Sequence, residues 1–198
     1  MSGPSGGLGG GFRQLGETTV LTSRVFSVRH LELEDPDGNR FERDVVDHPG
    51  AVAVVAVDAD GRASLVRQLR PAMGETVLEI PAGTRDVAGE DPAETARREL
   101  AEEAGLLAGR LRRLATVYNS PGYSNQRTII YLATDLSPCE TGRSGTEEHW
   151  MTIEPVALAE VERLVDEGRL LDSTSLTGLL LARSALGLDS TADGGGDG

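Results

Sequence analysis

Three acidic side chains recur at helical spacing in the middle of the chain. Glu99, Glu102 and Glu103 fall within the segment PAETARRELAEEA. Residues three or four positions apart share one face of an α-helix, so these carboxylates would lie side by side. A hard divalent cation such as Mg²⁺ binds oxygen ligands and would offset their mutual repulsion. For three glutamates alone, the alternative is a solvated helix face with ordinary ion pairs.

The helix that would carry these acids is marked at both ends. Asp91 suits the N-cap, Pro92 takes the first helical position, and Glu94 completes a capping-box pattern. Gly105 stands where a left-handed residue would end the helix. These signals predict a helix over residues 92–104. The apolar face that we expect to pack on a sheet comprises Ala96, Leu100 and Ala104.

Composition and charge exclude several classes of partner. The net charge of −13 over 198 residues repels nucleic acid and anionic membranes, so we expect neither as a partner. A phosphate substrate would also be repelled unless bound cations or well-placed arginines held it. No apolar run reaches the length of a membrane span. The one cysteine, Cys139, allows no internal disulfide, and the N-terminus lacks signal-peptide features, so we expect a cytoplasmic protein.

The residues around the acidic helix form one long pattern. It consists of Gly83, Glu90, Arg98-Glu99-Leu100, Glu102-Glu103 and Gly105-Leu106. This pattern resembles the Nudix box, G-x5-E-x7-R-E-U-x-E-E-x-G-U, where U is aliphatic. It departs from the box at one place, because six residues rather than five separate Gly83 from Glu90. The resemblance implies a Nudix hydrolase with a mixed α/β (α+β) fold, an α/β/α sandwich around a mixed sheet.

The resemblance also implies a metal site. By position, Glu99 and Glu103 would be the principal ligands of Mg²⁺ or Mn²⁺, with Glu102 assisting. In the ADP-ribose pyrophosphatase branch a backbone carbonyl before the box glycine also binds metal, which here is that of Ala82. Arg98 would brace the box through ion pairs. Bound metal would neutralise a pyrophosphate and activate water, and a nearby carboxylate would accept the proton.

Other segments resemble the ADP-ribose pyrophosphatase branch and imply substrate contacts. Pro121 and Gly122, in SPGYS, would line the pocket, although an ordinary strand connection would have the same composition. In VRQLR, Arg70 would bind phosphate, and Arg67 is the weaker candidate, with surface solubility as the alternative. Glu79, in LEIPAG, would hold the box loop or the substrate, unless it is a plain strand carboxylate.

A late acidic loop would supply the catalytic base. The segment SGTEEHWMTI contains Glu147 and Glu148. The expected distance of the base from the following strand favours Glu148, with Glu147 as the second candidate. Glu102 is a further catalytic candidate. The alternative is a solvated acidic loop. The implied reaction is hydrolysis of ADP-ribose to AMP and ribose 5-phosphate. The rivals are another nucleoside diphosphate derivative as substrate, a non-catalytic module that senses ADP-ribose, and a plain scaffold.

The pattern along the chain predicts four regions. Residues 1–16 are a flexible segment, 17–47 a β-hairpin subdomain, 48–188 the Nudix domain, and 189–198 a disordered tail. The resemblance implies a homodimer, with residues 17–47 as the dimerisation element. In the hairpin, residues 18–33 would form one strand, 35–38 the turn and 41–48 the return. Further strands are predicted at 51–58, 63–70, 77–83, 111–118, 127–133 and 149–154, and helices at 156–168 and 173–186.

Overall fold

The computed structural model describes residues 8–143, 145–146 and 148–188. The chain divides into two compact units. The first unit comprises Met1–Ala51, Thr84–Ala88 and Tyr118–Thr128. The second unit comprises Val52–Gly83, Gly89–Val117 and Ile129–Gly198.

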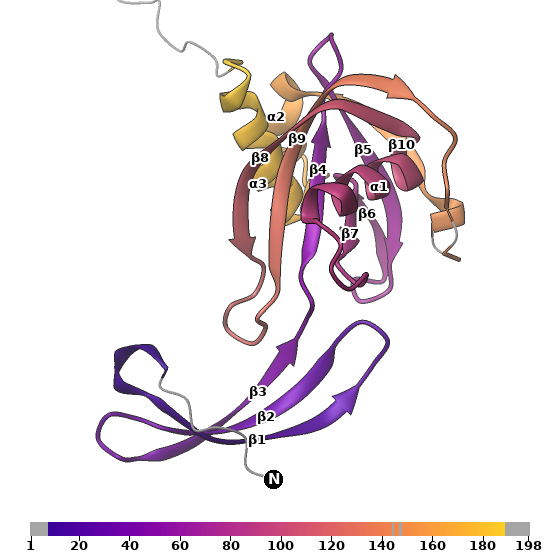
Figure 1. The fold of residues 1–198 in the computed structure, drawn as a ribbon. Coiled ribbons are helices and arrows are strands. Elements are labelled where there is room, and N and C mark those ends of the chain that lie inside the picture. The colour runs from indigo at the N-terminus through magenta and orange to yellow at the C-terminus, as the bar shows by residue number, and fades with distance from the viewer. Residues whose placement is uncertain (1–7, 144, 147, 189–198) are drawn as a thin grey trace, which may run out of the picture. The chain divides into compact units, whose positions relative to one another are not determined.

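The first unit contains an antiparallel sheet of three strands (Figure 1). In sheet order these are β1 (Arg13–Thr22), β2 (Ser27–Glu34) and β3 (Arg40–Asp47). The N-terminal antiparallel subdomain predicted from the sequence is present, but it has three strands instead of a single hairpin, because residues 18–33 form parts of two strands. In addition, β1 begins at Arg13, inside the segment expected to be flexible, after a short 3₁₀ turn, η1 (Gly9–Gly11).

The two turns of this sheet differ in their chemistry. Between β1 and β2, Ser23 Oγ accepts the backbone N–H of Phe26 at 3.1 Å and donates to the Phe26 carbonyl at 2.9 Å. Between β2 and β3, Asp35 Oδ1 accepts the N–H groups of Asp37 and Asn39, and Gly38 has a φ of 86°. The second turn is the one that the sequence predicted.

The strands of the second unit form two sheets (Figure 1). The four-stranded sheet has the order β7 (Ala82–Thr84), β4 (Ala51–Ala56), β9 (Arg127–Pro138) and β8 (Leu106–Tyr118). The three-stranded sheet has the order β10 (Thr152–Ala157), β5 (Arg62–Arg70) and β6 (Glu75–Glu79). The α-helices are α1 (Pro92–Ala104), α2 (Val161–Asp166) and α3 (Ser173–Ala185). Two short 3₁₀ turns are η2 (Glu148–Trp150) and η3 (Leu158–Glu160).

Strand β4 lies at the centre of the layers. All six of its residues are buried, as expected for a strand covered on both faces. Val52 and Val54 pack in one cluster with Leu100 of α1. Val55 packs in the other cluster with Leu179 of α3. Because successive strand residues point to opposite faces, helices cover both sides of the sheet, and the predicted sandwich is confirmed.

The C-terminal elements differ from the prediction in their bounds. Strand β10 runs to Ala157, because Val156 pairs with Ala63 of β5 and is buried there. The helix predicted at 156–168 is therefore shorter and starts at Val161, after η3. Strands β8 and β9 are longer than predicted. In the described part of the chain, no helix is both long enough and apolar enough to span a membrane.

Candidate metal and phosphate site

Helix α1 has the bounds that its capping signals predicted. Asp91 accepts the N–H of Ala93 at 2.8 Å, Pro92 is the first helical residue, and Gly105 ends the helix with a φ of 65°. The apolar face packs on β4 and β9 as expected, because Ala96, Leu100 and Ala104 are all buried in that cluster. The burial of this face fixes the rotation of the helix and hence the direction of its glutamates.

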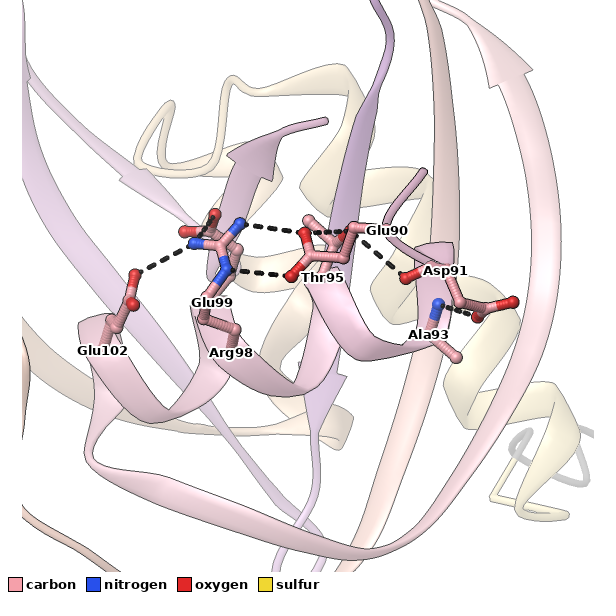
Figure 2. A network of polar contacts seen from close by, with 7 residues as sticks. All are labelled: Glu90, Asp91, Ala93, Thr95, Arg98, Glu99 and Glu102. Atoms are coloured by element: carbon pink, nitrogen blue, oxygen red, sulfur yellow. Dashed lines mark hydrogen bonds and ion pairs between the residues drawn. The ribbon is translucent and has the colours of Figure 1, made fainter. Parts of the chain in front are cut away.

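Arg98 is the centre of the ion pairs on α1 (Figure 2). Its Nη1 donates to Glu99 at 2.8 Å and to Glu102 at 3.1 Å, and Nε and Nη2 donate to Glu90 at 3.3 Å. Glu90 also accepts the hydroxyl of Thr95 at 2.8 Å. The hydrogen bond with Arg98, followed by that with Thr95, lowers the pKa of Glu90. The guanidinium thus offsets the repulsion among three carboxylates, as expected for a brace.

Glu103 ties the helix to the strand that precedes the loop. Its side chain is buried, and its Oε2 accepts the N–H of Ala82 at 2.9 Å. Ala82 is the first residue of β7, and Gly83 follows it. This hydrogen bond places the carboxylate of Glu103 against the backbone of β7.

Gly83 leaves room for a second carboxylate from α1. A Cβ at position 83 would overlap the carboxylate of Glu99, so only glycine accommodates that side chain at this distance. The Glu99 side chain is 13% exposed. Glu99 and Glu103 thus lie against neighbouring residues of β7, and this part of the site requires a residue without a side chain.

The segment between Gly83 and helix α1 contains a turn. Residues 87–89 form a bend and turn, and Gly89 has a φ of 79°, a left-handed conformation that favours glycine. Gly83 nevertheless keeps its place against Glu99. The longer spacing between Gly83 and Glu90 therefore leaves the carboxylate face of α1 intact.

Arg70 and Glu79 form a pair between adjacent strands. Arg70 Nε donates to Glu79 Oε1 at 2.8 Å, and Nη2 donates to Oε2 at 2.5 Å. The buried amide of Gln68 donates to the same carboxylate at 3.3 Å. The hydrogen bond with Glu79 raises the pKa of Arg70, and the charges of Glu103 and Asp172 add to this effect. Of the α1 acids, Glu103 thus contributes to the electrostatics of Arg70.

Family comparison agrees with this arrangement. The family model described as "NUDIX domain" matches residues 47–169 of this chain. The matched range includes the whole box and the Arg70–Glu79 pair. The chain belongs to the NUDIX domain family. The Nudix hydrolase identified from the box is therefore confirmed.

Several relatives match this chain over most of its length. An ADP-ribose pyrophosphatase of Mycobacterium tuberculosis is 38% identical over 169 residues, which cover 85% of this chain and 82% of the relative. An ADP-ribose pyrophosphatase of Bacillus subtilis is 36% identical, covering 81% and 89%. A crystal structure of an ADP compounds hydrolase superposes with a TM-score of 0.77 at 27% identity, covering 88% of this chain and 93% of that one.

The Nudix box residues fit a divalent cation, on which members of the family generally depend. The donors are carboxylate oxygens, and Gly83 provides a cradle for Glu99 that a Cβ would fill. Among the residues that the structure describes, no group of three or more His, Cys, Asp or Glu side chains is arranged to hold a metal ion. A bound cation would therefore also need backbone, water or phosphate oxygens, as is usual for Mg²⁺.

The second candidate arginine of the Nudix domain is engaged elsewhere. Arg67 Nη2 donates to Glu154 of β10 at 2.9 Å, and Arg169 donates to the other oxygen of Glu154 at 2.7 Å. These three residues link β5, β10 and the segment after α2. Arg67 is thus part of a surface ion-pair network, whereas Arg70 is paired with Glu79 of β6.

The other predicted site residues come from the β8–β9 loop and from the segment before β10. Pro121 and Gly122 belong to the first unit, where they are exposed in the β8–β9 loop and line a cavity of about 300 Å³ with Tyr118 and Tyr123. Glu147 is outside the described residues. Glu148 begins η2.

Sequence reasoning missed two residues of the site. Gln68 is buried in β5, and its amide donates to Glu79 of β6. The alternation of side chains between the two faces of the strand VRQLR was the signal that could have placed Gln68 on the same face as Arg70. Ser175, on α3, accepts the N–H of Ile80, and no local signal linked it to the box.

Proposed function

We propose that this protein hydrolyses the pyrophosphate bond of ADP-ribose, yielding AMP and ribose 5-phosphate. The observation that carries the proposal is that one short segment holds both partners: Glu79 binds Arg70, and Ala82, three residues later, donates its N–H to Glu103. This arrangement combines oxygen ligands for a cation with a guanidinium for phosphate. The names of the two bacterial relatives and of the structural relative support the same substrate class.

The cofactor in this proposal is Mg²⁺ or Mn²⁺. Glu99 and Glu103 are its principal ligands, with help from Glu102 and the carbonyl of Ala82. When bound, such an ion neutralises phosphate oxygens and lowers the pKa of coordinated water. Arg98 keeps Glu99 and Glu102 in place through its hydrogen bonds, so their carboxylates need little reorganisation.

The substrate contacts follow from the pairing of Arg70. Glu79 fixes the plane of the guanidinium by a two-point contact, and the remaining N–H groups of Arg70 are available to a phosphate oxygen. Pro121 and Gly122 remain proposed substrate-binding residues by their place in the sequence. Arg67 has a smaller role, because Glu154 already holds it.

Proton transfer is assigned to carboxylates by position. Glu148 is the proposed general base, with Glu147 and Glu102 as the other candidates. A carboxylate within hydrogen-bond reach of the attacking water would take its proton as the bond to phosphorus forms.

We also propose a cytoplasmic homodimer in which residues 17–47 make the contact. The proposed regions remain a flexible segment at 1–16, the Nudix domain at 48–188 and a disordered tail at 189–198. Strand β1 supports the contact, because Val20 and Leu21 are 59% and 52% exposed. Light scattering after gel filtration tests it: the native chain should run as a dimer, and Val20→Lys with Leu21→Lys should shift it toward the monomer.

A substrate panel tests the function. Purified protein with Mg²⁺ is offered ADP-ribose, other nucleoside diphosphate sugars, dinucleotides and oxidised nucleotides, and products are identified by ³¹P NMR in ¹⁸O-labelled water. The proposal requires ADP-ribose to have the highest kcat/KM. Preference for another compound would support the rival substrate class. Binding of ADP-ribose without turnover would support the sensing module.

A pair of variants on α1 tests the site. Glu103→Gln keeps an acceptor for the Ala82 N–H but removes the charge, so we expect turnover to fall by about 100-fold or more. Glu94→Gln on the same helix removes an exposed charge 3.9 Å from Arg97 and should leave turnover within about twofold. Equal activity in the two variants would refute the assignment.

A further inference from the structure

The C-terminal helix reaches the segment that precedes the Nudix box. Ser175, on the first turn of α3, is fully buried. Its Oγ accepts the N–H of Ile80 at 2.9 Å and donates to Asp172 Oδ2 at 2.6 Å. Asp172 also caps the helix by accepting the N–H of Ser175 at 2.7 Å. The hydroxyl is therefore fixed by partners on both sides.

Ile80 needs a partner of this kind. The pairing of β6 with β5 ends at Val66 and Glu79, one residue before Ile80. Ile80 is 1% exposed, so water does not replace the missing partner strand. A buried N–H without an acceptor is costly, and Ser175 supplies the acceptor from a helix far away in sequence.

Ile80 stands between the two halves of the proposed site. Glu79, directly before it, binds Arg70. Ala82, two residues after it, donates its N–H to Glu103. A shift of the backbone at Ile80 would change both contacts together. The charge of Asp172 also contributes, after Glu79 and Glu103, to the raised pKa of Arg70, so the start of α3 lies within electrostatic range of the guanidinium.

A glycine on α3 allows the helix to come this close. A Cβ at Gly178 would lie 3.0 Å from Ile80 Cδ1 and 3.0 Å from Val55 Cγ2. Such distances are shorter than ordinary van der Waals contacts, so α3 packs directly on β4 and on Ile80. This packing keeps Ser175 within hydrogen-bond distance of Ile80. The family match ends at residue 169, before α3 begins.

We infer that Ser175 is a positioning residue of the Nudix site, which acts through the Ile80 N–H to set Glu79 and Ala82 relative to Glu103. The inference rests on the proposed function, because it assumes that these residues bind cation and phosphate. Under it, the C-terminal helix is part of the catalytic architecture and not only of the core.

The test compares Ser175→Ala with two controls. Thr177→Ala removes another hydroxyl of α3, which donates to the Ser173 carbonyl at 2.7 Å. Leu164→Val trims the same buried core without touching the hydrogen bond to Ile80. Binding of Mn²⁺ is followed by electron paramagnetic resonance, and kcat and KM for ADP-ribose are measured at a temperature at which all variants are folded.

We expect Ser175→Ala to weaken Mn²⁺ binding about tenfold and to lower kcat about tenfold. Both controls should keep Mn²⁺ affinity and kcat within about twofold of the native protein. If Ser175→Ala does not fold, Ser175→Cys, with a weaker acceptor of similar size, takes its place in the same comparison. Native Mn²⁺ affinity in a folded Ser175 variant would overturn the inference, as would a native protein that binds no Mn²⁺. A native protein that binds Mn²⁺ but does not hydrolyse ADP-ribose would refute the proposed function alone, because the Mn²⁺ comparison still decides the role of Ser175.

Discussion

The carboxylate of Glu99 occupies the space that a side chain at Gly83 would fill. Gly83→Ala should therefore push Glu99 out of its position, and we expect turnover to fall by about 100-fold or more, as for loss of a metal ligand. Steady-state kinetics with ADP-ribose and Mg²⁺ measures the effect. Thr84→Ala, at the next position of β7, is the control.

A double variant shows whether Gly83 acts through Glu99. If it does, Gly83→Ala combined with Glu99→Gln should be no slower than Glu99→Gln alone, because the same interaction is lost only once. Additive losses in the double variant would mean that the glycine has a separate role.

Arg98 should stabilise the folded protein by relieving repulsion among acids. Its side chain is 32% exposed, so solvent screens its three ion pairs, and we expect Arg98→Ala to cost about 1 kcal/mol in the free energy of unfolding. Urea denaturation measures this loss. Arg110→Ala, whose pair with Asp135 is far more exposed, should be nearly neutral. A larger loss in the free energy of unfolding from Arg110→Ala than from Arg98→Ala would contradict this prediction.

The two arginines of β5 should respond differently to the same conservative change. Lysine cannot reproduce the two-point contact of Arg70 with Glu79, so Arg70→Lys should raise KM for ADP-ribose about tenfold, equivalent to about 1.4 kcal/mol. Arg67→Lys can keep a single ion pair with Glu154 and should leave KM within about twofold. Equal effects of the two changes would mean that both arginines, or neither, bind substrate.

His30 should make the stability of the first unit depend on pH. Its hydrogen bond to Asp44 raises its pKa above 6.5, and the charges of Glu42, Asp44 and Glu32 act in the same direction. A raised pKa means that the folded state binds the proton more tightly. The stabilisation is therefore complete below about pH 6.5 and is lost as pH rises through the higher folded value.

An NMR titration of the His30 ring measures this pKa directly. The pH dependence of unfolding should weaken in His30→Gln, which retains a polar side chain without the titration. A titration midpoint at or below 6.5 in the native protein would contradict the prediction.

The sequence predicted elements best where the signals were local. Helix α1 has the predicted bounds, because Asp91, Pro92 and Gly105 each act on the backbone beside them. The turn between β1 and β2 was missed because it contains no glycine, proline, asparagine or aspartate. The hydroxyl of Ser23 closes it instead.

The site shows the same division between local and distant contacts. The acids of α1 follow from spacing along one helix. The pairing of Arg70 with Glu79 depends on the register of β5 with β6. In that register the backbone of Arg70 lies opposite Glu75, and the Arg70 side chain extends along β6 to Glu79. The contact from Ser175 to Ile80 depends on packing between segments 95 residues apart, which no local pattern encodes.

The turn before α1 has a consequence for recognising such proteins. Although six residues separate Gly83 from Glu90, with a turn at residues 87–89 and a left-handed Gly89, Gly83 lies against the carboxylate of Glu99. A text pattern with a rigid gap between the glycine and the first glutamate would pass over this chain. A spatial template built from the glycine of β7 and the carboxylates of the helix would retrieve it, and would tolerate other insertions at that turn.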